Sequence, residues 1–177
     1  NVLAVRTGLN AQARHGADIM SRIGFAVAEK GQKKLEDLIR KQIGKLIDEL
    51  LAGAKVQSHQ IRDVTIVGNT VMHHLFCGID LTPLSHYPFE PQNDGLQIFR
   101  ASDVGWKLDG GCTVRFLPCL GSFVGSDILA GLLATKLHES EGPTALIDLG
   151  TNGEIVVGNR ERMLCASTAA GPAFEGA

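Results

Sequence analysis

The stretch TALIDLGTNGEIVVGN, residues 144–159, determines how the rest of the chain is interpreted. It predicts an apolar strand at 145–147, a polar turn over Asp148–Gly153, and a second strand at 154–157. The Asn-Gly pair at 152–153 lies between two β-prone runs and is a strong hairpin signal, because a two-residue turn requires φ > 0 at its central positions. The sequence therefore predicts a β-hairpin with a glycine-rich polar turn.

The predicted turn carries several groups that bind phosphate or metal. Gly150 and Gly153 free backbone N–H groups, while Thr151 and Asn152 add a hydroxyl and an amide. Backbone amides in a glycine-rich turn bind anions, and a carboxylate such as Asp148 can hold a divalent cation. Most Asn-Gly hairpins are only hairpins, so turn chemistry alone leaves a purely structural role open. An acid followed by Gly-Thr-Asn-Gly-Glu favours a loop that cradles nucleotide phosphates.

The composition is that of an ordinary globular protein. The 177 residues are 44% hydrophobic and 20% charged, with a formal net charge of −2, which gives no sign of a nucleic-acid partner. No apolar run is long enough to cross a bilayer and no signal-peptide pattern is present, so we expect no membrane partner and a cytoplasmic location. The four cysteines form no C-x-x-C pair, so they predict buried, reduced thiols rather than a zinc or iron–sulfur site.

Helices and strands alternate along the chain before the hairpin. Apolar periodicity predicts helices at 16–30 and 32–54, and Asp18 is interpreted as a charge at a helix start. The β-prone run at 2–6 is interpreted as the remnant of a strand, and residues 92–111 are polar and irregular. The other predicted elements are strands at 64–67, 114–117 and 162–169 and helices at 71–76 and 128–137.

Two glycine turns precede predicted helices. The first is Gly68-Asn69-Thr70, where Asn69 or Thr70 is expected to cap the helix and aim its N–H groups at an anion. The second is the run 121–127, in which Ser126 or Asp127 is the expected N-cap. Both turns therefore present polar groups at the end of a strand.

The order of elements predicts an α/β protein with mixed sheets. Gly142-Pro143 is interpreted as the boundary between a first unit at 1–141, which includes a connecting helix at 126–140, and a second unit at 142–177. Because a few strands alone leave apolar faces and edges uncovered, we expect the chain to form a homo-oligomer.

Six segments taken together resemble one known family. The segments are LNAQARHGADIMSRI (9–23), VGNTVMHHLFCGID (67–80), YPFEP (87–91), FLPCLGSFVGSDILAGLLAT (116–135), LIDLGTNGEIVVGN (146–159) and STAAGPAFEGA (167–177). In this order they resemble the C-terminal ATP-binding domain of the reductive activators of corrinoid proteins. Those proteins are iron–sulfur ATPases of the acetate and sugar kinase, heat-shock chaperone and actin (ASKHA) superfamily. The resemblance covers most of the chain except the helix at 32–54 and residues 92–112.

The resemblance implies a ribonuclease H-like architecture in which two lobes close over ATP and Mg²⁺. This chain would hold most of the first lobe and the first strands of the second. Asp127 would head the helix between the lobes and orient the attacking water or accept its proton. A plain N-cap role for Asp127 stays open beside this one. Gly68-Asn69-Thr70 would face the nucleotide from the first lobe.

The hairpin turn would be the second phosphate loop. The resemblance implies that Thr151, Asn152 and the N–H groups of Gly150 and Gly153 contact phosphate oxygens. Asp148 would bind the Mg²⁺ ion, most simply through water.

The activity implied is an ATP-dependent return of a cobalt(II) corrinoid protein to cobalt(I), with a low-potential electron donor. The resemblance places a first phosphate loop upstream of Asn1, an adenosine-binding segment beyond Ala177, and a 2Fe–2S domain elsewhere in the intact protein. We therefore expect this chain alone to be inactive. Two alternatives stay open, a small-molecule kinase of the same superfamily and a nucleotide-gated assembly module like the actin-type filament proteins.

Overall fold

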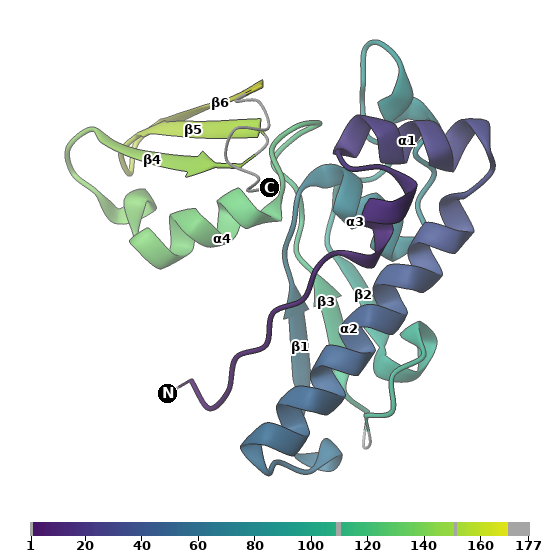
Figure 1. Cartoon of the computed structure of the whole chain (residues 1–177). Coiled ribbons are helices and arrows are strands. Elements are labelled where there is room, and N and C mark those ends of the chain that lie inside the picture. Colours follow the sequence, from purple (N-terminus) through teal and green to yellow (C-terminus); the bar gives the residue numbers. More distant parts are fainter. Residues whose placement is uncertain (1, 109–110, 151, 170–177) are drawn as a thin grey trace.

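The computed structural model describes residues 2–108, 111–150 and 152–169, which form two units (Figure 1). The first unit contains sheet A, with strand order β1-β3-β2, and the second contains sheet B, with order β4-β5-β6. The helices are α1 (Ile19–Ala28), α2 (Gln32–Ala54), α3 (Thr70–Cys77) and α4 (Ser126–Thr135), and the strands are β1 (Asp63–Ile66), β2 (Gln97–Arg100), β3 (Thr113–Phe116), β4 (Thr144–Leu149), β5 (Asn152–Gly158) and β6 (Met163–Ala169). The mixed α/β architecture expected from the sequence is confirmed.

Sheet A combines parallel and antiparallel pairing. β1 and β3 run parallel, as expected for strands joined by a crossover that contains a helix, here α3. β2 pairs antiparallel with β3, so Gln97 lies opposite Phe116 and Arg100 opposite Thr113. The expectation that residues 92–111 are irregular is therefore wrong over β2. Its alternation of half-buried and exposed residues is short and weakly apolar, which explains why the sequence pattern misses it.

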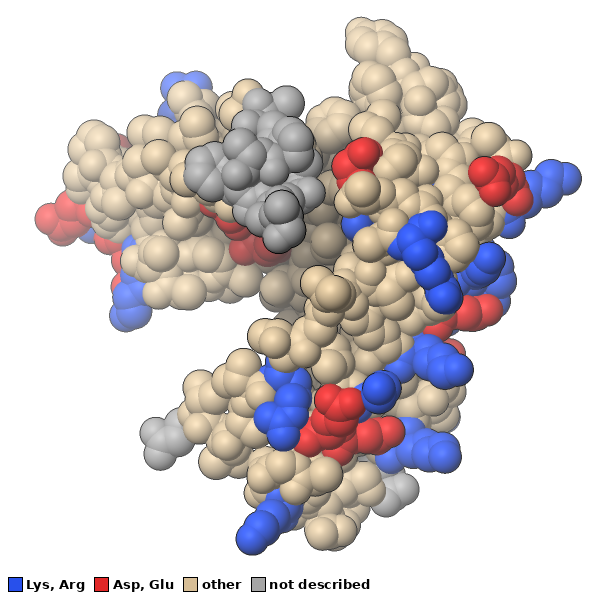
Figure 2. All heavy atoms as spheres, in the orientation of Figure 1, with Lys and Arg blue, Asp and Glu red and all other residues tan. Residues whose placement is uncertain are grey.

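Helix α2 covers sheet A and matches the predicted range of 32–54. Its apolar side packs on a buried cluster that includes Phe76, Val114 and Phe116. Gly44 allows a close approach, because a Cβ there would lie 2.7 Å from Cδ1 of Trp106. The Trp106 indole N–H donates to the Arg40 carbonyl at 2.8 Å. The opposite side of α2 carries mixed Lys, Arg, Asp and Glu side chains in solvent (Figure 2).

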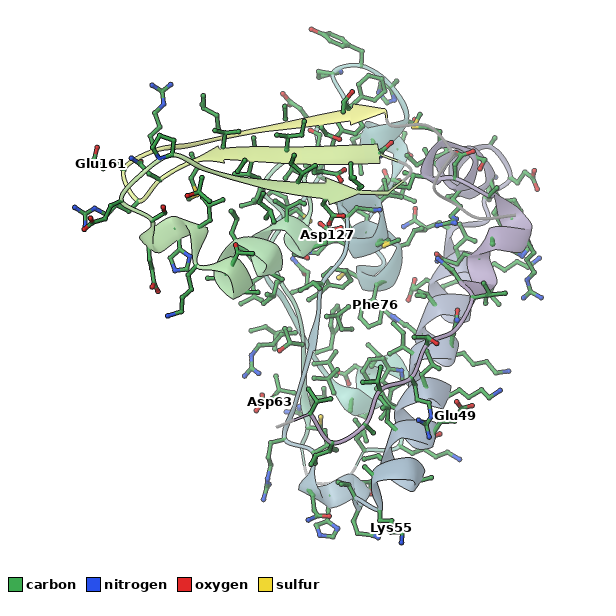
Figure 3. The ribbon with its side chains drawn as sticks, turned by 60° about the vertical axis from the view of Figure 1, so that its left-hand side comes forward. Glu49, Lys55, Asp63, Phe76, Asp127 and Glu161 are labelled. Carbon is green, nitrogen blue, oxygen red and sulfur yellow. The ribbon has the colours of Figure 1, made fainter. Side chains whose placement is uncertain are left out.

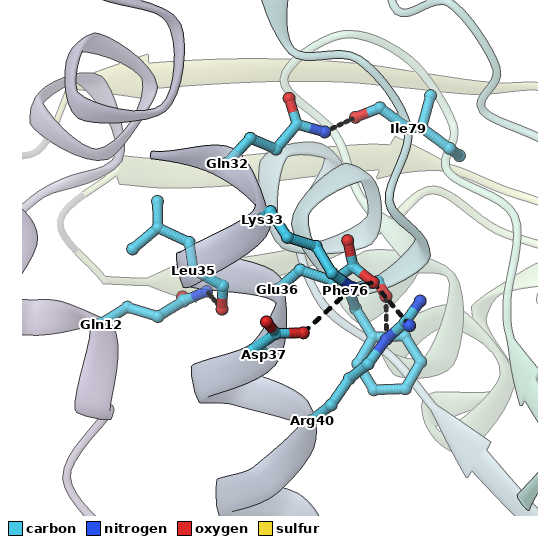
Figure 4. A network of polar contacts seen from close by, with 9 residues as sticks. All are labelled: Gln12, Gln32, Lys33, Leu35, Glu36, Asp37, Arg40, Phe76 and Ile79. Atoms are coloured by element: carbon cyan, nitrogen blue, oxygen red, sulfur yellow. Dashed lines mark hydrogen bonds and ion pairs between the residues drawn. The ribbon is translucent and has the colours of Figure 1, made fainter. Parts of the chain in front are cut away.

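A polar network ties α2 to the end of α3 (Figure 4). Arg40 Nη1 lies 2.6 Å from Oε1 of Glu36, and Arg40 Nε donates to the Phe76 carbonyl at 2.9 Å. Gln32 donates to the Ile79 carbonyl at 2.7 Å just beyond the helix. These side chains satisfy carbonyls at the end of α3, which lack partners within their own helix.

The second unit of the structure is sheet B together with α4, the helix that the expected boundary at Gly142-Pro143 assigns to the first unit. Ile128 and Leu132 of α4 form a buried cluster with Val156 of β5. The connecting helix expected at 126–140 is shorter than predicted, because Lys136 adopts a left-handed conformation (φ 57°) that ends α4 at Thr135. A 3-10 turn at Leu137–Glu139 follows.

The outer face of sheet B is exposed and apolar. Its side chains include Ile147, Leu149, Val157 and Leu164, which are 46–62% exposed. Strand alternation places them opposite the face that packs on α4. Self-association of the chain stays a prediction, and this face is where we expect it.

Two local expectations are corrected. The run at 2–6 forms no strand, and the segment up to Asn10 instead passes along α2, where Gln42 accepts from the Ala11 N–H at 2.8 Å. Cys112 and Cys119 are buried, as expected, but Cys77 is only half-buried and Cys165 is exposed; all four are free thiols. Among the described residues, every helix is too short or too polar to cross a bilayer.

Candidate functional site

A cleft lies where the two units meet, and it consists of two adjoining cavities. One has a volume of about 360 Å³ and the other about 420 Å³. The start of α1, the β1–α3 turn and the β4–β5 hairpin contribute to both cavities. Figure 3 shows Asp127, at the start of α4, beneath sheet B where this sheet approaches the first unit.

The smaller cavity is lined by four carboxylates, those of Asp18, Asp127, Asp148 and Glu154. Asp148 on β4 pairs in register with Glu154 on β5, so both side chains point to the same face of sheet B. That face carries Leu146 and packs on α4, whose second residue is Asp127. Strand register and helix packing thus bring the three acids of the second unit together.

The acids influence one another's protonation. Burial raises the pKa of Asp127, and the negative charge of Asp148 raises it further. Burial also raises the pKa of Glu154, to which Asp127 and Asp148 add, while a hydrogen bond from Ser167 at 3.3 Å works in the opposite direction. Clustered carboxylates that disfavour their own ionised forms are an environment that a bound cation would stabilise.

The donor set fits Mg²⁺ held in part by water. Within the described part of the chain, no three His, Cys, Asp or Glu side chains are close enough to wrap a metal ion directly. Mg²⁺ retains several waters and commonly takes only one or two carboxylates together with substrate phosphates. Asp148 and its neighbours therefore suit a metal ion whose remaining ligands are water and phosphate oxygens.

The hairpin turn differs in detail from the expected one. Asp148 lies within β4 rather than in the turn, and Asn152 and Gly153 lie within β5, where they pair with Ala169 and Thr168. The Gly150 N–H donates to the Asn152 carbonyl at 2.9 Å, so this amide is engaged inside the hairpin. Gly150 and Asn152 border the smaller cavity. Gly153 is buried in the sheet, and Thr151 lies outside the described residues.

The β1–α3 turn reaches the cleft with two of its three predicted residues. Asn69 and Thr70 border the cavities, whereas Gly68 is buried behind them. Asn69 is the N-cap of α3 and accepts from the Met72 N–H at 2.9 Å, as predicted. The Thr70 hydroxyl donates to the Gly121 carbonyl at 2.6 Å, so its role is in the turn itself.

Two expectations about helix starts are resolved. Gly125, not Ser126 or Asp127, is the N-cap of α4, and no side chain caps this helix. Asp18 is the N-cap of α1 and forms a capping box with Ser21, which confirms its role at a helix start.

Sequence reasoning missed several residues of the cleft. Asp18 borders both cavities, although the sequence gives it only a capping role. The larger cavity is mostly apolar, with Met20, Val71 and Phe123 beside Ser167. The alternation along β6 could have placed Ser167 opposite Glu154, but nothing local indicates that α1 reaches the hairpin.

Two family descriptions match consecutive parts of the chain. "RACo middle region" matches residues 1–140, and "C-terminal domain of RACo the ASKHA domain" matches residues 142–177. The chain belongs to the RACo family. The ASKHA description of residues 142–177 agrees with the fold class expected from the sequence.

Two curated relatives and a solved structure support the same family assignment. The chain is 35% identical over 170 residues to "Corrinoid activation enzyme RamQ" of Eubacterium limosum, covering 96% of this chain and 28% of the relative. It is 25% identical over 170 residues to "[Co(II) methylated amine-specific corrinoid protein] reductase" of Methanosarcina barkeri, covering 91% of this chain and 31% of the relative. The structure of "Reductive activator for corrinoid,iron-sulfur protein" superposes with a TM-score of 0.93 at 34% identity, over 100% of this chain and 28% of that one. The chain thus spans less than a third of the length of these relatives.

Proposed function

We propose that this chain forms part of an ATP–Mg²⁺ cleft in a protein that reductively reactivates a corrinoid protein. The observation that carries the proposal is the meeting of Asp127, Asp148 and Glu154 with the hairpin turn in one cavity of a RACo-family chain. A loop with glycine and small polar residues beside carboxylates suits phosphate oxygens bridged by a hydrated metal ion.

Each group has a proposed role. Asp148 binds Mg²⁺ through water, and Mg²⁺ neutralises charge on the phosphates. Asn152 and Thr151 contact phosphate oxygens, a role supported for Asn152 by its position at the cavity. Gly150 leaves space for this approach, because a Cβ there would meet, among the described residues, a single atom, the Asn152 carbonyl oxygen, at 3.5 Å. Gly153 keeps the turn in register from inside β5.

The first lobe and α4 complete the cleft. Asn69 faces the nucleotide from the β1–α3 turn, Thr70 borders the cleft while its hydroxyl holds the Gly121 carbonyl, and Gly68 supports the turn from behind. The carboxylate of Asp127 orients the attacking water or accepts its proton. Its raised pKa follows from burial and favours a group that can accept a proton once a cation has neutralised its neighbours.

In the intact protein, ATP would drive an unfavourable electron transfer. A low-potential donor would pass one electron, through a 2Fe–2S cluster outside this chain, to cobalt(II) of the corrinoid partner and give cobalt(I). Each 59 mV of unfavourable potential for one electron is about a tenfold penalty. Nucleotide binding can offset it only by favouring a complex in which cobalt(II) is easier to reduce.

The names of the relatives favour this function over a small-molecule kinase or an assembly module, since each name refers to corrinoid activation or reduction. The test is Asp148→Asn in the intact protein, with Asp48→Asn on the solvent side of α2 as the matched control. We expect ATP turnover to fall about a hundredfold for Asp148→Asn, with a raised Mg²⁺ requirement, and to stay unchanged for the control. ATP turnover that is unaffected by Asp148→Asn would remove the metal-side role.

A further inference from the structure

The side chain of Ser126 is used in an unexpected way at the start of α4. It is fully buried, with 0% exposure. A serine at a helix start commonly caps its own helix, but here the hydroxyl bonds a different segment. Ser126 Oγ donates to the Gly68 carbonyl at 3.1 Å and accepts from the Gly68 N–H at 3.1 Å. The Ser126 N–H also donates to the Gly68 carbonyl, at 2.9 Å.

Both backbone polar groups of Gly68, its N–H and its carbonyl, are therefore held by one residue. A hydroxyl can donate once and accept twice, and a carbonyl can accept twice. Ser126 Oγ therefore uses its one donor and one of its two acceptor positions here, and the Gly68 carbonyl uses both of its acceptor positions. The surrounding backbone is equally constrained. A Cβ on Gly125 would lie 2.3 Å from the Asn69 Cα and 2.3 Å from the Gly68 carbonyl oxygen, so the two turns touch backbone to backbone.

This contact is the main joint between the two units. Among the described residues, no helix or strand of 11–116 packs extensively against a helix or strand of 126–169. Sheet B is attached to α4 through the cluster around Ile128 and Val156, so the position of α4 sets the position of the hairpin. The hydrogen bond from the Thr70 hydroxyl to the Gly121 carbonyl, at 2.6 Å, adds a second contact between the β1–α3 turn and the segment that leads into α4.

Asp127 follows Ser126 directly and has no comparable anchor of its own. Among the described residues, its carboxylate accepts from backbone N–H groups of its own turn, those of Ile128, at 2.9 Å, and of Asp127 itself. The place of its carboxylate in the cavity is thus determined by where the first turn of α4 is fixed. A shift of about 1 Å in a reacting group can cost about a hundredfold in rate.

We propose that Ser126 is a positioning residue, whose doubly bonded hydroxyl fixes α4 on the Gly68 peptide and thereby sets the Asp127 carboxylate in the cleft. This inference rests on the proposed role of Asp127 in ATP turnover. It assigns to Gly68 a supporting contact with α4 in place of a direct contact with nucleotide.

The test measures ATP turnover of the intact protein in a double-mutant cycle of Ser126→Ala and Asp127→Ala, with rates normalised to ATP sites counted by calorimetry. We expect Ser126→Ala to lower kcat on the order of tenfold in the wild-type background, with the KM for ATP changed less than about twofold. In the Asp127→Ala background the same change should alter kcat less than about twofold. Thr135→Ala, at the other end of α4, is the control that should leave the rate unchanged.

A second readout needs no nucleotide. Amide hydrogen exchange at Gly68 should accelerate about tenfold or more in Ser126→Ala, because its N–H loses the Oγ acceptor, and should stay unchanged in Thr135→Ala. Ser126→Cys keeps the side-chain volume nearly constant and replaces the hydroxyl with a weak hydrogen-bonding thiol, so it should give the same kinetic pattern.

The outcomes separate the two claims. A wild-type rate that Ser126→Ala leaves unchanged, an equal loss in both backgrounds, or unchanged exchange at Gly68 would overturn the positioning role and leave the proposed function standing. A wild-type intact protein that does not turn over ATP, or one insensitive to Asp127→Ala, would overturn the catalytic role of Asp127 and this inference with it.

Discussion

Replacement of Arg40 by Met is expected to destabilise the chain by removing the centre of the α2–α3 network. The Arg40 guanidinium lies 2.6 Å from Glu36, and the two side chains are only 15% and 10% exposed. Arg40 also donates to the Phe76 carbonyl at 2.9 Å and lies over the Phe76 ring, 5.4 Å from its centroid. Met keeps the unbranched apolar stem, so the substitution isolates the loss of the charged group.

The magnitude follows from what is left behind. Removing one member of a buried ion pair costs about 3–5 kcal/mol because the other charge stays buried. Here Lys33, 70% exposed, remains 2.9 Å from the same Glu36 oxygen and offsets part of that loss. We therefore assign about 2 kcal/mol to the stranded carboxylate and about 1 kcal/mol to the Phe76 carbonyl. For a chain of this size the sum of roughly 3 kcal/mol lowers Tm by roughly 6–12 °C.

The assay is thermal unfolding followed by circular dichroism at neutral pH. Lys45→Met is the matched control, since Lys45 also pairs four residues along α2, with Glu49 at 3.7 Å, but with side chains 78% and 44% exposed. It should cost less than about 0.5 kcal/mol. Adding Glu36→Gln to Arg40→Met should recover part of the loss. If Arg40→Met costs no more than Lys45→Met, the reasoning from burial is wrong.

Three further predictions concern buried positions. Gly125→Ala should lower stability on the order of 3 kcal/mol, because its Cβ would overlap the β1–α3 turn. Gly24→Ala in α1, whose Cβ would meet no described atom within 4 Å, should be neutral or slightly stabilising. Equal melting temperatures for the two variants would contradict this. Burial, and then the neighbouring histidine, lower the pKa of His73. Below about pH 6.5 the unfolded chain therefore binds a proton at this histidine that the folded chain does not, which destabilises the folded state. The urea midpoint should fall as the pH is lowered from 7.5 to 5.5, and it should fall less in His73→Gln. Parallel pH profiles of the two proteins would exclude His73 as a source of this pH dependence. Burial raises the pKa of Cys77 to about 12, so a thiol reagent at pH 8 should modify exposed Cys165 first, and faster labelling of Cys77 would argue against its burial.

The elements that the sequence predicts well are those whose signal is local. The range 32–54 is correct because its apolar period runs unbroken from the residue after Gly31 to the left-handed Lys55. The hairpin is correct in outline because β4 and β5 are both β-prone. The run at 2–6 shows the limit of such signals, since β-propensity makes a strand only where a neighbour is available to pair with it.

The features that the sequence could not predict depend on distant partners. Ser126 resembles an N-cap, but its hydroxyl bonds Gly68, 58 residues earlier, and the cap position falls to Gly125. The Asn152-Gly153 pair resembles a turn, but pairing with β6 draws both residues into β5. The approach of α1 to the hairpin, which brings Asp18 into the cleft, likewise has no signature in the sequence around it.

The carboxylate at the start of α1 has a consequence for the order of ligand arrival. A bare helix N-terminus attracts anions, but Asp18 already supplies the compensating negative charge there. Three more acids line the same cavity against one basic residue, Arg22, so free ATP would meet a net negative charge there. The cleft should therefore discriminate against the uncomplexed triphosphate and accept nucleotide as its magnesium chelate, which makes the divalent ion part of recognition as well as of chemistry.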